Sequence, residues 1–346
     1  MSTVVASRRD FVVPADRVAT APPEHRGIAR DAIGLLVAGP SRIDHARFAD
    51  LPRFLAPGDL VVVNVSATRP AAIDGDLGGR DVVVHLSTRH AHDTWIVEVR
   101  RADGTGPVLD RSPGDRIQLP GAGCVTLLAP ATPGATRLWW ACVAVPGAVV
   151  DDHMAVHGRP ITYGRPVERW PLTAYQTIFA ARPGSAEMAS AGRPFSDRTV
   201  VDLVRAGIAV APVTLHAGVS SPELHEDPSP EWYEVPAATA AQVRQTRRAG
   251  RRVVAVGTTV TRALETVAAA DGGVAPGAGW TDLVLGPDRP ARVVDGLLTG
   301  WHEAAASHLL LLEAVAGAAL VDRAYAAALD GPYLWHEFGD ACLLLP

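Results

Sequence analysis

The stretch VVAVGTTVTRALE, residues 253–265, is the main indication of the fold class of this chain. Four apolar residues end at Gly257, two threonines follow, and the apolar spacing then becomes helical, which is typical of a buried strand that enters a helix. In open α/β sheets, ligands bind outside the carboxyl ends of the strands, against helix N-termini. Gly257, Thr258 and Thr259 therefore have two interpretations: they contact a ligand, or a threonine caps the helix.

The same strand–helix alternation continues on both sides of this stretch. The patterns predict strands at 60–63, 208–216, 251–257, 281–287 and 291–300, and helices at 197–207, 258–270 and 303–317. Strands that alternate with helices indicate βαβ units and a mostly parallel sheet. We therefore expect an α/β domain over most of the chain.

Residues 71–150 have a different sequence pattern. Short β-rich runs such as DVVVHLSTR, TWIVEVR and RLWWACVAV are separated by glycine-containing turns, without a helical period. Such a series is typical of a small sandwich or barrel. We predict a discontinuous α/β domain, residues 1–70 and 151–346, with a small antiparallel β-barrel domain inserted at residues 71–150.

Composition narrows the functional classes. The chain has 346 residues, 48% of them hydrophobic, and a net charge of −5, which is ordinary for a folded protein and argues against general nucleic-acid affinity. Three cysteines without CxxC spacing favour a reducing cytoplasm over a disulfide framework. We find no signal peptide, no run of ~20 apolar residues for a membrane helix, and no dinucleotide, P-loop or nucleophile-elbow motif.

Several histidines are candidate functional groups. His216 ends one predicted strand and His302 follows another, so both should lie at the same sheet edge as Thr258, as acid–base groups or as structural histidines. His85, His90 and His92 lack a second ligand cluster, so we expect no metal site there. In the β-rich part, one ring of Trp139 and Trp140 should fill the core, while the other is a weak candidate for base stacking.

The order of these motifs resembles the S-adenosylmethionine:tRNA ribosyltransferase-isomerase family of queuosine biosynthesis. The likeness covers most of the chain. It rests on DLPRFLAPGDLVVVN (50–64), AYQTIFA (174–180, family YQTVYA), VTLHAG (213–218, family TLHVG), EWYEVP (231–236), AVGTTVTRALE (255–265), VDGLLTGWH (294–302, family VDxLITNFH) and GPYLWHEFGDACLL (331–344, family end YRFFSYGDAMLI-like).

The resemblance implies a discontinuous α/β fold with an inserted barrel, and an enzyme that is both a transferase and an isomerase. Such an enzyme moves and isomerises the ribosyl part of S-adenosylmethionine onto a 7-aminomethyl-7-deazaguanine base in tRNA. The product is epoxyqueuosine, and adenine and methionine are released. The implied route begins by removing a proton next to the sulfonium, and no cofactor is needed beyond S-adenosylmethionine as substrate.

The resemblance also implies site residues. The catalytic candidates are His216, His302 and Glu265. The substrate-binding candidates are Gly257, Thr258, Thr259, Arg262, Tyr175, Gln176, Gly192, Phe195 and Asp295. Arg262 and Glu265 also have a simpler interpretation as an i, i+3 surface pair.

The chain departs from the family in segments 64–67, 190–196, 228–232 and 300–309, which include two lost histidines. Two rival hypotheses therefore stay open: a divergent paralog that cleaves S-adenosylmethionine or uses a small-molecule acceptor, and a non-catalytic S-adenosylmethionine-binding protein. A tRNA partner should need a basic strip. The candidates, on one helix face if the helix continues past Gly250, are Arg244, Arg247, Arg248, Arg251 and Arg252. The alternative is a solvated helix end.

Overall fold

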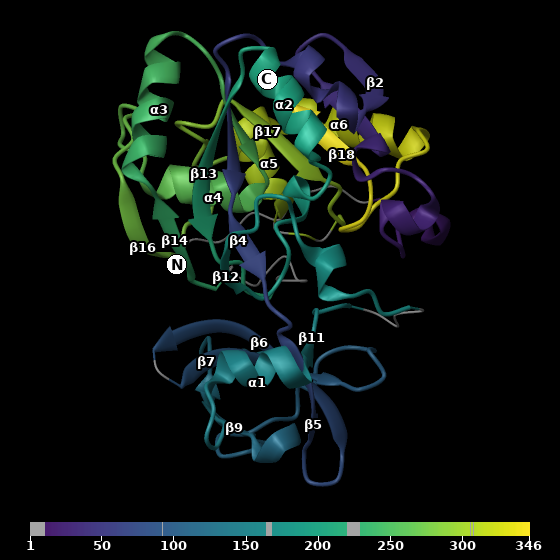
Figure 1. Cartoon of the computed structure of the whole chain (residues 1–346), viewed down its shortest axis with the longest axis vertical. Helices are drawn as coiled ribbons and strands as arrows, with labels where there is room; N and C mark the ends of the chain where they lie inside the picture. Colours follow the sequence, from purple (N-terminus) through teal and green to yellow (C-terminus); the bar gives the residue numbers. More distant parts are fainter. Residues whose placement is uncertain (1–10, 92, 164–167, 220–228, 305, 307) are drawn as a thin grey trace.

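The computed structural model describes residues 11–91, 93–163, 168–219, 229–304, 306 and 308–346. The chain forms a large α/β domain and a smaller β-barrel, which lies below the α/β domain in Figure 1. The chain enters the barrel after β4 (Ser66–Thr68) and leaves it after β11 (Gly158–Arg159). None of the described helices is long and apolar enough to cross a membrane.

The α/β domain is built on a nine-stranded sheet. In spatial order its strands are β16 (Gly277–Thr281), β14 (Glu231–Val235), β13 (Ala209–Leu215), β3 (Leu60–Asn64), β15 (Val253–Val256), β17 (Gly296–Gly300), β18 (Ala341–Leu344), β1 (Gly34–Ala38) and β2 (Ile43–Arg47). The four strands from β13 to β17 run parallel, as predicted. Four other pairs of neighbouring strands are antiparallel: β13–β14, β14–β16, β17–β18 and β1–β2. The sheet is therefore mixed rather than mostly parallel.

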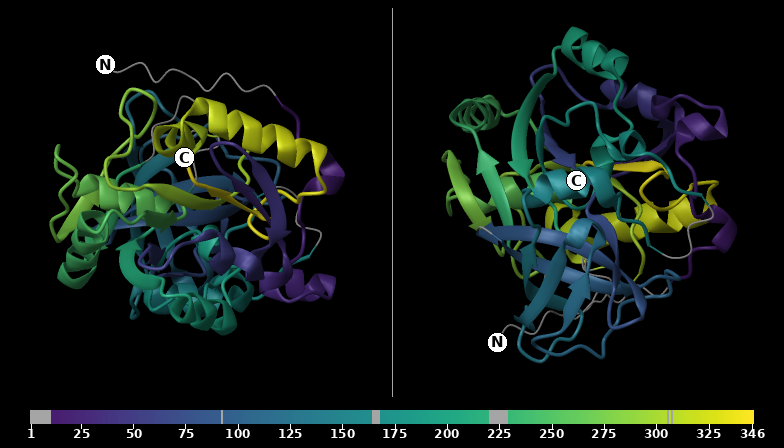
Figure 2. Two further views of the ribbon diagram at one scale, coloured as in Figure 1. Left: turned by 90° about the horizontal axis from the view of Figure 1, so that it is seen from above. Right: turned by 60° about the horizontal axis from the view of Figure 1, so that its bottom comes forward.

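Helices cover both faces of this sheet, which explains why its central strands are apolar throughout. Leu60 and Val62 of β3 face one hydrophobic core, and Val61 and Val63 face the other. A strand buried on both sides has no polar face, so the apolar run is continuous. The first core is closed by α3 (Ala237–Arg248), α4 (Thr258–Thr266), α5 (His308–Ala316) and α6 (Ala318–Asp330); the second by α2 (Asp197–Arg205) and the 3₁₀ segment η4 (Phe48–Phe54). Figure 2 shows α2 and α6 on opposite sides of the domain.

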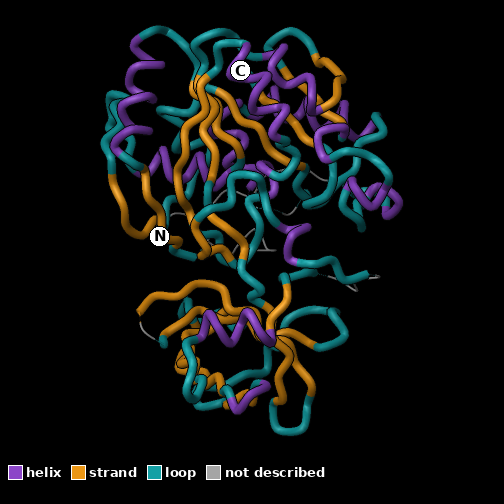
Figure 3. Tube along the Cα trace, viewed as in Figure 1, coloured by secondary structure: helices purple, strands orange, loops and turns teal. Residues whose placement is uncertain are grey.

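The inserted unit is a closed antiparallel barrel. Its strands in spatial order are β5 (Ala72–Asp76), β6 (Asp81–Ala91), β7 (Thr94–Arg101), β10 (Leu138–Ala144), β9 (Cys124–Pro130) and β8 (Arg116–Gln118), and β8 pairs with β5 to close the ring. Trp139 lies in the barrel core and Trp140 is half-buried, as expected for the pair. Strands and loops dominate the barrel in Figure 3, in contrast to the helix-rich α/β domain.

The chain leaves the barrel later than position 150. Helix α1 (Val150–His157) buries Val150 and Met154 in the barrel core. Strand β11 then pairs with β5. Residues 151–159, which the sequence pattern assigned to the α/β domain, therefore pack with the barrel.

One predicted strand is wrong. The pattern TDLVLGP predicted a strand at 281–287, but β16 ends at Thr281 and residues 282–287 form no strand. Leu283 and Leu285 are buried in the first core, which produces the alternation. The Leu283 carbonyl accepts a hydrogen bond from Arg262 instead of pairing with a neighbouring strand. The alternation of apolar and polar residues in this segment therefore reflects the burial of side chains and not the pairing of a strand through backbone hydrogen bonds.

Two helix ends also differ from the prediction. Helix α4 stops at Thr266 and not near 270, and the chain after it forms a bridge between Ala268 and Val274. Helix α3 stops at Arg248, because Gly250 adopts a left-handed φ of 65°.

The five arginines proposed for one helix face are therefore divided. Three contacts are structural: Arg244 donates to the Val274 carbonyl, Arg247 donates to the Val293 carbonyl, and Arg252 pairs with the buried Asp59. Arg251 and Arg252 lie beyond the end of α3. These residues do not form the single basic helix face that the sequence suggested.

Candidate active site

A cavity of about 760 Å³ lies at the carboxyl ends of β15 and β17 and extends to the barrel. Parallel strands meet at one edge of the sheet, which is where α/β proteins form ligand sites. The α/β domain supplies the first turn of α4, the loop after β17 and the loop before β18. The barrel side supplies Arg100, Arg137 and the segment around Tyr163. We refer to this space below as the cavity.

The first turn of α4 is part of the cavity wall. Gly257, Thr258 and Thr259 all line it. Gly257 is the N-cap with φ 90°, and a Cβ there would meet Ala191 at 3.3 Å, so glycine suits the position. No side chain caps the helix, and the Thr259 hydroxyl accepts instead from Asn64 Nδ2 at 3.2 Å. The capping interpretation of these threonines is therefore wrong.

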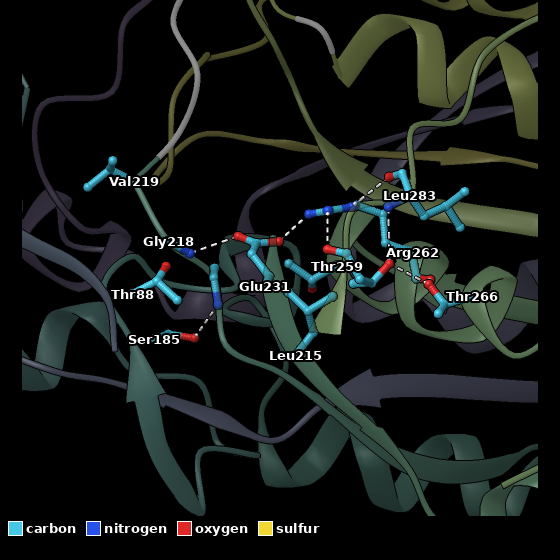
Figure 4. A network of polar contacts seen from close by, with 12 residues as sticks. Thr88, Ser185, Leu215, Gly218, Val219, Glu231, Thr259, Arg262, Thr266 and Leu283 are labelled. Carbon is cyan, nitrogen blue, oxygen red and sulfur yellow. Dashed lines mark hydrogen bonds and ion pairs between the residues drawn. The ribbon is translucent and has the colours of Figure 1, made fainter. Parts of the chain in front are cut away.

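Arg262, one turn further along α4, lies in the cavity wall and not on the protein surface, and it connects several elements of that wall (Figure 4). It forms an ion pair with Glu231 of β14 and donates to the carbonyls of Thr281 and Leu283. The other oxygen of Glu231 accepts from the Gly218 N–H at 2.7 Å. This network links α4 to β14 and to the loop after β13, so the cavity wall is held from three elements.

His302 lies in the cavity wall at the end of β17, where the sequence predicted it. Its Nε2 lies 3.0 Å from the Thr299 hydroxyl, and its ring stacks on His308 at 4.7 Å between centroids. Burial lowers the pKa of His302 well below its ordinary value, and His308 acts in the same direction. Burial and the charge of Arg262 lower the pKa of His308 to about 4. Both rings are neutral at pH 7, so each has a nitrogen lone pair.

His216, the other catalytic candidate, is not among the residues that line the cavity. Its Nδ1 lies 2.8 Å from the Ser66 hydroxyl, and Ser66 bonds in turn to Ser185 at 2.6 Å. The ring stacks on Trp232. Burial, followed by the charges of Arg69 and Arg182, lowers the pKa of His216 to about 4. These contacts tie β4, β12 (Arg182–Ser185) and the end of β13 together behind the cavity.

Glu265 and Asp295 are placed away from the cavity as well. Both oxygens of Glu265 accept backbone N–H bonds, at 2.8–3.0 Å, from Arg292, Val293 and Val294. Asp295 accepts from the Val253 N–H at 2.9 Å and lies 3.5 Å from Arg247. Neither carboxylate lines the cavity. Both fix the chain that enters β17 and β15, at the opposite ends of these strands from the threonines.

The remaining binding candidates divide in the same way. Tyr175 lines the cavity. Phe195 is fully buried in the second core, and Gln176 exchanges hydrogen bonds with the backbone of Thr68. Gly192 is buried in the 3₁₀ turn η7 (Ser190–Gly192), beside the cavity-lining Ser190 and Ala191.

The histidines once considered for metal binding are engaged elsewhere. His85 is buried against Glu98 in the barrel, and His90 stacks on Trp280 at 4.2 Å between ring centroids. His92 lies outside the described residues. Within the described part of the chain, no group of three or more His, Cys, Asp or Glu side chains could hold a metal ion.

Several cavity residues were not among the candidates from the sequence. They are His308, Thr299, Trp301, Trp335, Tyr163, Glu187 and Glu337. His308, the first residue of α5, could have been suspected because it lies only six positions after His302. Glu187 and Glu337 are 150 positions apart and belong to no common motif, so only the packing of the chain brings them to one cavity.

Comparison with known proteins gives consistent matches over nearly the whole chain. The family model described as queuosine biosynthesis protein matches residues 6–344. A protein of Acidiphilium cryptum named S-adenosylmethionine:tRNA ribosyltransferase-isomerase is 34% identical, covering 97% of each chain. A protein of the same name from Gloeobacter violaceus is 36% identical, covering 97% of this chain and 95% of its own.

A solved structure also resembles this chain. The S-adenosylmethionine tRNA ribosyltransferase of Thermotoga maritima is 28% identical and superposes with a TM-score of 0.54, covering 97% of this chain and 99% of its own. The likeness therefore includes both the α/β domain and the inserted barrel.

Proposed function

The chain belongs to the queuosine biosynthesis protein family, and from this premise we propose that it is an S-adenosylmethionine:tRNA ribosyltransferase-isomerase. It transfers and isomerises the ribosyl moiety of S-adenosylmethionine onto a 7-aminomethyl-7-deazaguanine base in tRNA, and it releases adenine and methionine. The observation that carries the proposal is the match over residues 6–344, together with a large cavity at the predicted strand ends.

The first turn of α4 is the proposed site for the charged end of S-adenosylmethionine. Helix N-termini present unpaired backbone N–H groups and a favourable dipole to a carboxylate. The hydroxyls of Thr258 and Thr259 add donors at the same place. Arg262 supports this turn through Glu231 and the backbone of residues 281–283. Tyr175 completes the proposed binding residues.

His302 is the proposed base for the proton next to the sulfonium. The ring is neutral, it lines the cavity, and Thr299 orients it through Nε2. The positive sulfur acidifies the adjacent carbon, so a neutral imidazole that lines the cavity suffices as base. His216, Glu265 and Asp295 act in this proposal as residues that position the strand ends and the chain leading into them, because none of them lines the cavity.

The proposed substrates are S-adenosylmethionine and tRNA, and no other cofactor has a role in this scheme. We propose a cytoplasmic location, because all three cysteines are free and tRNA is the acceptor. Arg244 and Arg247 of α3, and Arg252 beyond its end, are engaged in contacts within the chain, so these three are not proposed as tRNA contacts.

The test is mass-spectrometric analysis of the purified protein incubated with S-adenosylmethionine. One reaction contains tRNA with the aminomethyl-deazaguanine base, a second contains tRNA with guanine at that position, and a third contains no tRNA. We expect adenine and methionine in the first reaction alone, with a matching mass gain on the tRNA. Release in all three would indicate a cleaving enzyme or another acceptor, and release in none would indicate a binding protein.

A further inference from the structure

We propose that Glu187 and Glu337 bind the primary ammonium group of the acceptor and that Glu337 removes its proton before the amine attacks. This inference rests on the proposed function, because it assigns the amine of that reaction to a place in the cavity. Both side chains line the cavity, and they come from the loop after β12 and the loop before β18.

The two carboxyl groups differ in how they are held. Glu187 accepts a hydrogen bond from the Tyr163 hydroxyl, from the segment that leaves the barrel. Glu337 makes no hydrogen bond through its carboxyl group to any described residue, and His336 Nδ1 lies 3.9 Å from it. An ionised carboxyl group that is partly buried without hydrogen-bond donors is costly unless it stays protonated or receives a cation. Of the two glutamates, Glu337 is therefore the one whose carboxylate a bound cation would stabilise.

A second observation on the same wall also indicates a ligand. The rings of Trp301 and Trp335 line the cavity and are only 4% and 2% exposed. Neither indole N–H has a hydrogen-bond acceptor within the described part of the chain. Unpaired buried donors also occur elsewhere among the described residues, for example at Trp95 in the barrel core, so an unpaired indole N–H by itself does not mark a ligand site. Trp301 and Trp335 differ from Trp95 because they line the same cavity as the Glu337 carboxyl group, where a polar ligand can reach them.

The charges around Glu337 favour this role. Burial, and then the neighbouring charge of Glu187, raise the pKa of Glu337 to about 8, and Arg193 opposes this only in part. Arg193 already donates to Glu24 at 2.9 Å and to the Ala174 carbonyl at 2.8 Å. The titratable and charged groups that face Glu337 are Glu187, Arg193, His336 and Tyr175, with Tyr163 bound to Glu187.

The proton balance of the step is simple. One N–H bond of the ammonium breaks, its electron pair stays on nitrogen as the nucleophile, and an O–H bond forms on Glu337. The equilibrium constant for proton transfer from a primary ammonium, with a pKa of about 10, to an ordinary carboxylate is unfavourable by roughly a millionfold. When the carboxyl pKa is about 8, the equilibrium constant is unfavourable by only roughly a hundredfold. No oxidant, reductant or further reactant is required.

The acceptor amine suits this site better than the cationic groups of S-adenosylmethionine. A sulfonium sulfur has no proton to give, and the α-ammonium of methionine takes no part in the chemistry. The acceptor is the one cation that must lose a proton before it can act.

The test compares two tRNAs that differ in one group: one carries the 7-aminomethyl base and the other the neutral 7-cyano base. Dissociation constants are measured at pH 7.5 for the wild type, Glu187→Gln and Glu337→Gln, and for Glu168→Gln, an exposed control. The affinity of each variant for S-adenosylmethionine is measured by calorimetry. We expect the wild type and the control to prefer the aminomethyl tRNA by about tenfold, and both cavity variants to lose that preference.

A second readout addresses the proton. In the wild type, kcat/KM for transfer should rise with pH up to about 8, because the ionised carboxylate is required. In Glu337→Gln this rise should disappear, and the remaining rate should be lower at every pH. A purely structural role would change the rate without changing the shape of the profile.

The outcomes are separable. A preference for the aminomethyl tRNA that survives in both variants, or is absent from the wild type, overturns the inference. Weaker S-adenosylmethionine binding with an unchanged preference assigns the pair to the methionine ammonium and also overturns it. The binding assay needs no turnover, so a wild type that releases no adenine refutes the proposed function while the binding result stays readable.

Discussion

Two glutamates, one fully buried in the barrel and one partly buried in the cavity wall, have pKa values that are shifted in opposite directions. Glu98 is fully buried, with His85 at 3.2 Å and Arg100 and Arg137 each at 3.0 Å. Burial by itself raises its pKa, yet these three partners lower it to about 2. Burial also raises the pKa of Glu337, but there Glu187 adds to the effect and the pKa is about 8.

The difference separates structure from function within one molecule. In the barrel, the buried carboxylate of Glu98 has three partners, as expected where a stable fold requires a compensated charge. In the cavity wall, the carboxyl group of Glu337 has no hydrogen-bond donor among the described residues. Unpaired indole N–H groups occur in both places, at Trp95 in the barrel core and at Trp301 and Trp335 in the cavity wall, so the contrast lies in the two carboxyl groups.

The largest loss of activity is expected from a substitution at His302. His302→Ala should lower the rate of adenine release by roughly 10²–10⁴-fold, the usual contribution of an acid–base group. Its free energy of unfolding should change little, because the ring faces the cavity. His216→Ala is the matched variant, and it should lower stability more and the rate less, since that ring is tied to Ser66. A greater loss of rate in a well-folded His216→Ala protein would contradict the assignment of the base.

The next largest effect is expected in the barrel. Glu98→Ala leaves Arg100 and Arg137 buried without their shared carboxylate, which should lower the free energy of unfolding by about 3–5 kcal/mol. Chemical denaturation followed by the fluorescence of the barrel tryptophans measures it, with Glu168→Gln as an exposed control. A loss below about 1 kcal/mol would mean that this network contributes little.

The pH dependence of stability should separate the two glutamates by sign. The lowered pKa of Glu98 contributes stability above its unfolded pKa of about 4.5, and this is lost as pH falls toward 2. The raised pKa of Glu337 acts in the opposite way: it lowers stability as pH rises from about 4.5 to about 8. Glu337→Gln should therefore be more stable than the wild type at pH 8.5, by about 1–3 kcal/mol, and equal to it near pH 4.5.

Denaturation curves at these two pH values test the sign directly. A variant that is no more stable at pH 8.5 than at pH 4.5, relative to the wild type, would remove the contrast between the glutamates.

The smallest effect is expected on the affinity for S-adenosylmethionine, from a substitution in the first turn of α4. Thr259→Val removes one hydroxyl from the cavity wall and should weaken S-adenosylmethionine binding by about 0.5–1.5 kcal/mol, the net value of one hydrogen bond. Thr266→Val, at the other end of α4, is the control, because its hydroxyl bonds to the Arg262 carbonyl and to Thr281 and does not line the cavity. Equal effects in the two variants would mean that the ligand lies elsewhere.

Much of the fold was predictable because it depends on local patterns. Apolar runs of strand length, helical spacing and glycine turns predicted β3, β13, β15, β17, α2, α4 and α5, and the change of sequence pattern predicted the barrel. The prediction failed where one pattern has two causes. Leu283 and Leu285 alternate for burial without forming a strand, and α3 ends where Gly250 takes a left-handed conformation.

The family, the two-part architecture and the sheet edge expected to hold a ligand could be inferred from periodicity and from the order of motifs along the chain. The packing of the chain was needed to place His302 in the cavity wall, with His216 and Glu265 outside its lining. It also places Glu187, 150 positions earlier in the chain, in the same cavity wall as Glu337, where its charge raises the pKa of Glu337. The direction of a side chain and its distant neighbours depend on how the elements pack, and local periodicity carries no record of that packing.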